Sequence, residues 1–213
     1  THSFCCVMED KKDLKVVTYT ADSDFVPENH YYTKVLNAQL HPLVKYFMSL
    51  NMEQIVARYV HMKPTVSADF LKSLLAKIPQ NFRWGGADLF YTTDLNGSRS
   101  MIIVETNSCP SGQKSFPYVE DKEVRNGYYE LVKKTFLPAL RLAAEAGTLP
   151  EGGLAVLYDK NPTETHGYAI TLAQLTKEKV YCVKCSQNDP DPSIRWVDEG
   201  TILEVRDEKG EWH

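Results

Sequence analysis

The sequence lacks any run of apolar residues long enough to cross a membrane. No stretch approaches the roughly 18 consecutive apolar residues that a membrane-spanning helix requires. Thr1 to Asp10 also lack the charged start and apolar centre of a secretion signal. We therefore expect a cytoplasmic protein that has no membrane partner.

An excess of charge of one sign is also missing. The 24 Lys and Arg residues stand against 28 Asp and Glu residues, which gives a net charge of −4. Such a balance does not predict a surface that neutralises a phosphate backbone over a long stretch, so we expect no nucleic-acid partner. The 213 residues, of which 43 % are hydrophobic, are enough for one large globular domain or two small ones.

A second CxxC motif is absent as well. The five cysteines include one CxxC, Cys182 to Cys185, and one adjacent pair, Cys5 and Cys6. These four thiols offer an alternative reading as a zinc site. We expect instead that Cys182 packs as a small apolar residue of a buried strand and that the cysteines are reduced in an intracellular protein.

The N-terminal part of the chain predicts one strand followed by helices. Residues 14–20 are rich in β-branched residues, which indicates a strand, and residues 21–29 predict a loop. Apolar residues then recur at helical spacing over residues 30–50, where Pro42 should kink or divide the helix. Two further helices are predicted over residues 52–61 and 68–78, the second capped by Ser67.

The central part predicts an antiparallel hairpin. Residues 87–93 and 100–107 are rich in aromatic and β-branched residues, and the Asn96-Gly97 pair between them is typical of a tight turn. Because side chains alternate along a strand, Met101, Ile103, Glu105 and Asn107 are expected on one face. A carboxylate and an amide oxygen two residues apart suit a shared Mg²⁺ ion, and Asp88 on the preceding strand can add a second carboxylate.

The C-terminal part predicts a β-α-β unit. One long helix is expected at about residues 123–146, ended by Gly147 and Pro150. Residues 154–158 indicate a buried parallel strand, residues 163–176 a helix and residues 180–183 a second strand. Residues 194–205 predict one or two short strands. The expected fold class is α/β, with a helical and hairpin-containing part over residues 1–150 and a small Rossmann-like domain over residues 151–213.

The hairpin and the loop after it resemble a known family. Gly86-Ala87-Asp88-Leu89-Phe90, a turn, and then Glu105-Thr106-Asn107-Ser108-Cys109-Pro110-Ser111-Gly112 are similar to the acidic strand, E-x-N motif and small-residue loop of ATP-grasp ligases. The P-S-G after E-x-N is most similar to the circularly permuted members, the glutathione synthetase-like and glutathionylspermidine synthetase-like proteins. The resemblance is specific over about thirty residues of the chain.

The resemblance implies an ATP- and Mg²⁺-dependent ligase that joins a small carboxylic acid to an amine through an acyl phosphate. Asp88, Glu105 and Asn107 would hold the Mg²⁺ ions that bridge the phosphates of ATP. The loop residues Ser108, Cys109, Ser111 and Gly112 would bind the acid substrate through N–H and hydroxyl donors.

Two departures from the family pattern bear on this function. Several members carry an Arg two residues before the first acidic ligand, where this chain has Gly86, so Arg83 is the candidate that takes its place. The lysine pair and Gly-rich lid that grip the nucleotide have no counterpart here. Because the chain also starts with Thr1 and stops after strand-like sequence, we expect it to be part of a longer protein.

Three alternatives remain open from the sequence. The first is a degenerate ATP-grasp fold that binds or scaffolds without catalysis. The second is a hydrolase that uses Cys109 as nucleophile and His166 or His30 as base. In the third, four residues that follow a predicted strand either contact substrate or belong to a solvated loop with a helix cap: Lys160, Thr163, Glu164 and His166.

Overall fold

The computed structural model describes residues 14–77, 83–107, 112–120, 125–149 and 152–213. The chain divides into two compact units, of which one combines Thr1–Ala38 with Trp84–His213 and the other consists of Gln39–Arg83. We call them the sheet unit and the helical unit. The predicted boundary near residue 150 falls on residues 150–151, outside the described residues, and the division at that point stays a prediction.

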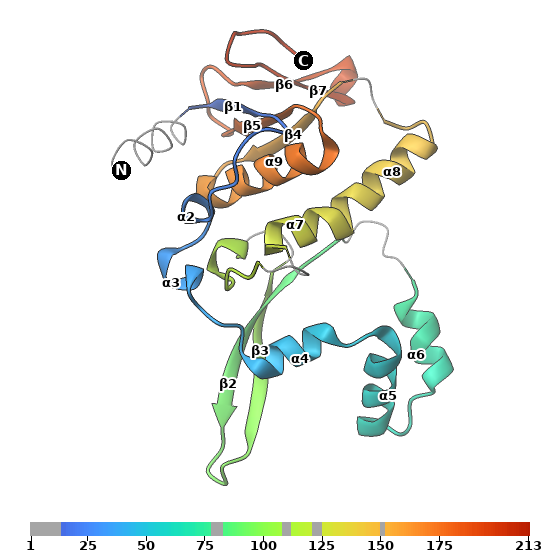
Figure 1. The fold of residues 1–213 in the computed structure, drawn as a ribbon. Helices are drawn as coiled ribbons and strands as arrows, with labels where there is room; N and C mark the ends of the chain where they lie inside the picture. The colour runs from blue at the N-terminus through green and yellow to red at the C-terminus, as the bar shows by residue number, and fades with distance from the viewer. Residues whose placement is uncertain (1–13, 78–82, 108–111, 121–124, 150–151) are drawn as a thin grey trace. The chain divides into compact units, whose positions relative to one another are not determined.

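The sheet unit is built on a three-stranded sheet in the order β1-β5-β4 (Figure 1). Strand β4 (Leu154–Tyr158), helix α9 (Pro162–Thr176) and strand β5 (Val180–Lys184) form the predicted β-α-β unit, in which β4 and β5 are parallel. Strand β1 (Val16–Tyr19) pairs antiparallel with β5 at the edge of the sheet. The protein is therefore of mixed α/β class, as expected.

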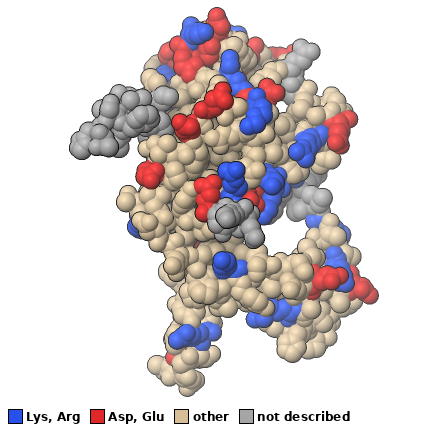
Figure 2. Space-filling model, viewed as in Figure 1, with Lys and Arg blue, Asp and Glu red and all other residues tan. Residues whose placement is uncertain are grey.

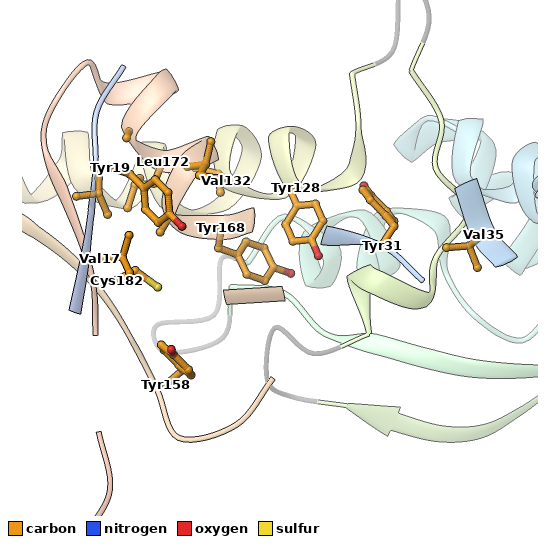
Figure 3. Close-up of a cluster of buried hydrophobic side chains, with 14 residues drawn as sticks. Val17, Tyr19, Tyr31, Val35, Tyr128, Val132, Tyr158, Tyr168, Leu172 and Cys182 are labelled. Atoms are coloured by element: carbon orange, nitrogen blue, oxygen red, sulfur yellow. The ribbon is translucent and has the colours of Figure 1, made fainter. Parts of the chain in front are cut away.

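Helix α9 lies at the centre of the sheet unit. Its residues Glu164 to Ala173 are all buried, because the sheet covers one side and the segments around α2 (Pro27–His30) and α7 (Gly127–Leu131) cover the other. The resulting core is rich in tyrosine, and Figure 3 shows Tyr128 and Tyr168 side by side, with a ring separation of 4.8 Å. Burial of these large rings supplies much of the apolar area removed from water on folding.

A second, smaller core covers the other face of the sheet. The hairpin of β6 (Ile194–Val197) and β7 (Ile202–Val205) is antiparallel and is joined by the short turn η3 (Asp198–Gly200). Val16, Tyr181, Val183 and Val205 form a buried cluster against which Ile194 packs. The sheet thus has apolar side chains on both faces, as a buried sheet requires.

The predicted long helix of residues 123–146 is interrupted. It begins at α7, where the Asn126 side chain accepts the N–H of Tyr129 at 3.1 Å, and continues through a π-helical turn, η2 (Val132–Phe136), into α8 (Leu137–Glu145). Residues 121–124 lie outside the described residues. The single-helix prediction overlooked Pro138, which has no N–H to donate and whose ring crowds the preceding turn. The N–H of Leu137 bonds the carbonyl of Val132, five residues back, which is the wider π pattern.

The helical unit contains α4 (Pro42–Ser49), α5 (Met52–Met62) and α6 (Ala68–Leu75). The last two match the predicted helices, and Ser67 accepts the N–H of Phe70 at 3.4 Å as the expected cap. The expected division at Pro42 is confirmed, because Pro42 starts α4 as its first residue, and a further break that was not expected separates α2 from α3 (Thr33–Leu36). Proline is well placed at the start of α4 because its fixed φ suits a helix start.

The described residues contain no helix that is both long and apolar enough to span a bilayer. Figure 2 shows acidic and basic side chains interspersed on the face in view. This distribution agrees with the near balance of charge in the sequence.

Candidate functional site

The predicted hairpin is present and brings two carboxylates opposite each other. Strand β2 (Gly86–Thr93) pairs antiparallel with β3 (Arg99–Asn107), and the register sets Asp88 against Glu105. Directly opposite residues of an antiparallel pair lie on the same face with Cβ atoms about 4.5–5.5 Å apart. Both residues are exposed. The hairpin therefore places two negative side chains together on a solvent-facing surface.

A register shift between Asp88 and Leu89 changes the expected faces of β3. Asp88 pairs with Glu105 but Leu89 pairs with Ile103, so Val104 is an extra residue in the ladder, a β-bulge. The alternation is interrupted at that point. Since Ile103 now lies opposite Leu89, which faces away from Asp88, the expectation that Ile103 and Met101 share a face with Glu105 is not met. The bulge separates the acidic end of the hairpin from its apolar part.

The acidic end also contains the predicted amide ligand. Asn107 follows Glu105 by two residues, so it lies on the same face, and it is paired with Gly86. Among the described residues, neither Asp88 nor Glu105 has a hydrogen bond or an ion pair to another side chain. Like charges on directly opposite residues of an antiparallel pair are unfavourable, and a bound divalent cation would relieve the repulsion.

The predicted acid-binding loop lies mostly outside the described residues. Ser108, Cys109 and Ser111 belong to the segment that the structure does not describe. Gly112 is the first described residue after it and has a φ of 109°, which only glycine adopts readily. It leads into the 3₁₀ turn η1 (Gln113–Ser115).

A buried glutamate on α9 holds this 3₁₀ turn in place. The Glu164 carboxylate is only 2 % exposed and accepts the N–H of Gln113 at 2.5 Å and that of Lys114 at 3.4 Å. The Tyr32 N–H donates to the Lys114 carbonyl at 2.9 Å from the other side. The segment that directly follows the predicted loop is thus fixed to the first turn of α9.

Lys114 brings a positive charge to the carboxyl end of β4. Its ammonium group donates to the Asn161 side chain at 2.5 Å and lies 3.8 Å from the Glu164 carboxylate. Asn161 directly precedes α9 in the left-handed conformation. This is the edge of the sheet where open α/β folds commonly bind ligands.

Of the four residues in the third alternative, Glu164 and His166 are buried, so the solvated-loop interpretation is wrong for these two. Lys114 itself was missed from the sequence. The position of Glu164 in the first turn of a predicted helix is a signal that could have drawn attention to it, but a sequence pattern does not show which backbone N–H groups it binds.

Arg83, the predicted substitute for the missing arginine, is exposed and is the last residue of the helical unit. Gly86 and the acidic pair belong to the sheet unit. The role assigned to Arg83 therefore stays a prediction.

The histidines proposed as bases for Cys109 are buried in the core. His166 is 1 % exposed and its Nδ1 atom lies 2.7 Å from the Tyr19 hydroxyl, whereas His30 is fully buried and its Nδ1 atom lies 3.0 Å from the Thr163 carbonyl. Such positions suit structural hydrogen bonds better than proton exchange with a loop thiol. Cys109 itself lies outside the described residues.

Cys182 is packed in the tyrosine-rich core and is 1 % exposed, and burial raises its pKa to about 12. The Cys185 thiol lies 3.5 Å from the Tyr158 carbonyl. Cys5 and Cys6, the other two ligands of the alternative zinc site, lie outside the described residues.

One other group of side chains could bring three ligand atoms together in the described part of the chain. Asp207, Glu211 and His213 have ligand atoms within 4.8 Å of one another. The Asp207 carboxylate is already engaged there: one oxygen accepts the N–H groups of Lys209 and Glu211 at 2.9 Å, and the other lies 3.1 Å from His213. These bonds account for the cluster without a metal.

Comparisons with protein-family models, with curated proteins and with solved structures find no match to this chain.

Proposed function

We propose that this chain carries the metal- and acid-binding part of an ATP- and Mg²⁺-dependent carboxylate–amine ligase with an ATP-grasp-like fold. The observation that carries the proposal is the register of the hairpin, which sets Asp88 against Glu105 and places Asn107 two residues further on the same strand. The three residues proposed as metal ligands thus lie at one end of one hairpin.

The donor set suits Mg²⁺. Two carboxylates and one amide offer the hard oxygen ligands that this ion prefers, and Mg²⁺ commonly keeps one or two protein carboxylates beside nucleotide phosphates. Asp88, Glu105 and Asn107 would hold the ion, which would neutralise charge on the phosphates of ATP. The two carboxylates are exposed on the hairpin, and Asn107 is partly exposed.

The segment fixed by Glu164 would serve the acid substrate. Lys114 supplies a positive charge near the end of the predicted loop, and its position is set by Asn161 and Glu164. In the proposed reaction an oxygen of the acid attacks the γ-phosphorus of ATP and ADP leaves. The amine nitrogen then attacks the acyl carbon, phosphate leaves, and an amide results. The protein contributes mainly by positioning the reactants.

The first experiment measures the metal site alone. Mn²⁺, used as a spectroscopic substitute for Mg²⁺, is titrated by electron paramagnetic resonance with and without ATP into the natural protein, Asp88→Asn and Glu105→Gln. We expect at least tenfold weaker binding in both variants, because each loses one carboxylate ligand. Glu178→Gln is the matched control, since Glu178 is an exposed carboxylate directly after α9. Equal Mn²⁺ affinity in all four proteins would remove the metal site and the proposal with it.

A non-catalytic binding module is the second candidate, and the exposed apolar side chains of the hairpin favour it. Phe90 and Ile103 are 64 % and 63 % exposed, which is typical of surfaces that contact another molecule. Gly86, where the family places an arginine, agrees with this candidate. Phosphate release from ATP in the presence of mixed carboxylic acids and amines separates the two: a ligase is stimulated by the mixture, whereas a binding module is not.

A further inference from the structure

A hollow of about 480 Å³ lies at the free edge of β1, away from the hairpin. Strand β1 has a neighbour on one side only, because it is the outer strand of its sheet. The walls of the hollow come from three segments: the residues at and just before the start of β1, the residue before β6, and the chain that follows β7. They comprise Leu14, Lys15, Val16, Ser193, Arg206, Asp207, Glu208, Gly210 and Trp212. We call it the edge groove.

The register of β1 turns the backbone of Val16 toward the edge groove. Val16 lies opposite Val183, and the flanking residues are joined by a bond of 2.7 Å from the Lys184 N–H to the Lys15 carbonyl. In an antiparallel ladder this pattern identifies Val16 and Val183 as the pair that exchanges no hydrogen bonds. The N–H and C=O of Val16 therefore point away from β5, and neither bonds a described residue.

Thr18 is the next residue of β1 whose backbone faces outward, and it is covered by a carboxylate. Thr18 has the same orientation as Val16, and its N–H donates to the Glu208 carboxylate at 2.5 Å while its hydroxyl donates to the same group at 2.7 Å. The chain after β7 thus covers the edge at Thr18 and leaves it open at Val16. Covering an edge strand limits its pairing with other segments. The uncovered backbone of Val16, beside the edge groove, therefore has room to pair with another segment.

The charges around the edge groove are already engaged with each other. Lys15 lies 2.7 Å from Asp189, and Arg206 lies 2.7 Å from Asp191. Asp207 and Glu208 accept backbone N–H groups. A charged ligand would therefore gain little here, whereas a neutral group with one donor and one acceptor complements Val16. Leu14 and the ring of Trp212 offer apolar walls for its side chains.

We propose that the edge groove binds an extended, uncharged peptide segment, which adds to β1 and exchanges both backbone hydrogen bonds with Val16. Main-chain pairing supplies the affinity in this mode of recognition, and the apolar walls select the flanking side chains. The hollow is within the size range of ligand pockets, roughly 300–1,000 Å³. This binding site is independent of the proposed ligase activity.

The test uses amide NMR spectroscopy of the whole chain and a capped pentapeptide of alternating threonine and valine. In the free protein the Val16 amide should exchange with solvent at least tenfold faster than the Val17 amide, which faces β5. Addition of the peptide should slow the exchange at Val16 and shift the signals of Val16 and Trp212. The same peptide with methylated backbone nitrogens should do neither, because it has lost its donors.

Two variants locate the binding. Leu14→Glu places a charge in the wall of the edge groove and should weaken binding at least fivefold, whereas Leu142→Glu, at another exposed leucine, in α8, should not. The proposal is overturned if Val16 is already protected in the free protein, if the peptide causes no shift up to millimolar concentration, or if the methylated peptide binds equally well. Protection of Val16 that rises with protein concentration alone would assign the edge to a second copy of the chain instead.

Discussion

Asp88 and Glu105 lie opposite each other on the hairpin, where like charges repel. Cross-strand pairs of this kind contribute about 0.2–1 kcal/mol, and opposite like charges are destabilising. Without metal, Asp88→Asn should therefore slow hydrogen exchange of the hairpin amides. Addition of Mg²⁺ should slow exchange in the natural protein and leave the variant unchanged. If Mg²⁺ protects both proteins equally, the ion does not bind at this pair.

Glu164 is the buried charge whose removal should cost most. Its carboxylate accepts two backbone N–H groups and lies beside the Lys114 ammonium. Leaving such donors unsatisfied costs about 1–3 kcal/mol, so Glu164→Ala should lower the free energy of unfolding by about that amount. Glu164→Gln keeps one acceptor oxygen and should lose less. Urea unfolding measures both, with Glu178→Ala as the exposed control; equal losses at the two positions would contradict the role of Glu164.

Because of Cys182, the free energy of unfolding should fall at alkaline pH. Burial raises the pKa of its thiol from 9.0 to about 12, so the folded protein favours the neutral thiol. This contribution is fully present below pH 9 and is lost as the pH rises toward 12, because the unfolded thiol ionises first. Cys182→Ala removes it. The unfolding free energy of the variant should fall less between pH 8 and pH 10 than that of the natural protein. An identical fall in both would show that the thiol is not protected.

At the scale of elements, the turn of the hairpin depends on a glycine. Gly97 has a φ of 78°, and the Asp94 carboxylate accepts the N–H groups of Asn96 and Ser98 at 2.8 Å. Alanine at position 97 would carry a left-handed conformation that costs about 1–2 kcal/mol. Gly97→Ala should therefore speed hydrogen exchange in β2 and β3 severalfold. The amides of β5 serve as the internal control and should be unchanged, since β5 lies in another sheet.

The elements that the sequence predicted well are those with local patterns. The Asn-Gly turn marked the hairpin, and the β-α-β unit was found with β4 at its predicted bounds. The bulge at Val104 and the antiparallel pairing of β1 with β5 were not predictable in the same way. Both depend on partners distant in sequence, so hydrophobic period alone does not determine them. The π-helical turn could have been predicted, because Pro138 stands in the sequence.

The same distinction between local patterns and long-range contacts applies to the candidate site. Strand period and the family resemblance named Asp88, Glu105 and Asn107, and the register brings the two acids opposite each other. The link from Glu164 to Gln113 spans 51 residues, and no local pattern indicates it. The burial of His30 and His166, the bases suggested for Cys109, was not predictable for a related reason, because it results from the packing around α9.

At the scale of the whole molecule, the two compact units differ in how much they bury. The sheet unit has its tyrosine-rich core around α9 and a second cluster behind the sheet. In the described part of the helical unit, the three helices bury only Val56 and Leu71, and α4 buries none of its residues. Apolar burial is the main favourable contribution to folding, so the units should differ in stability.

The chain should therefore unfold in two steps, with the helical unit first. Val56→Ala removes one of the two buried side chains of that unit and should shift only the first step, whereas Ile170→Ala in α9 should shift only the second, by about 2–5 kcal/mol. Substitutions in two units that unfold independently should each change the stability of their own unit only. Urea titration followed by hydrogen exchange of α5 and of α9 distinguishes the steps. If both variants shift both steps together, the two units form one cooperative structure, and the division between Ala38 and Trp84 has no energetic meaning.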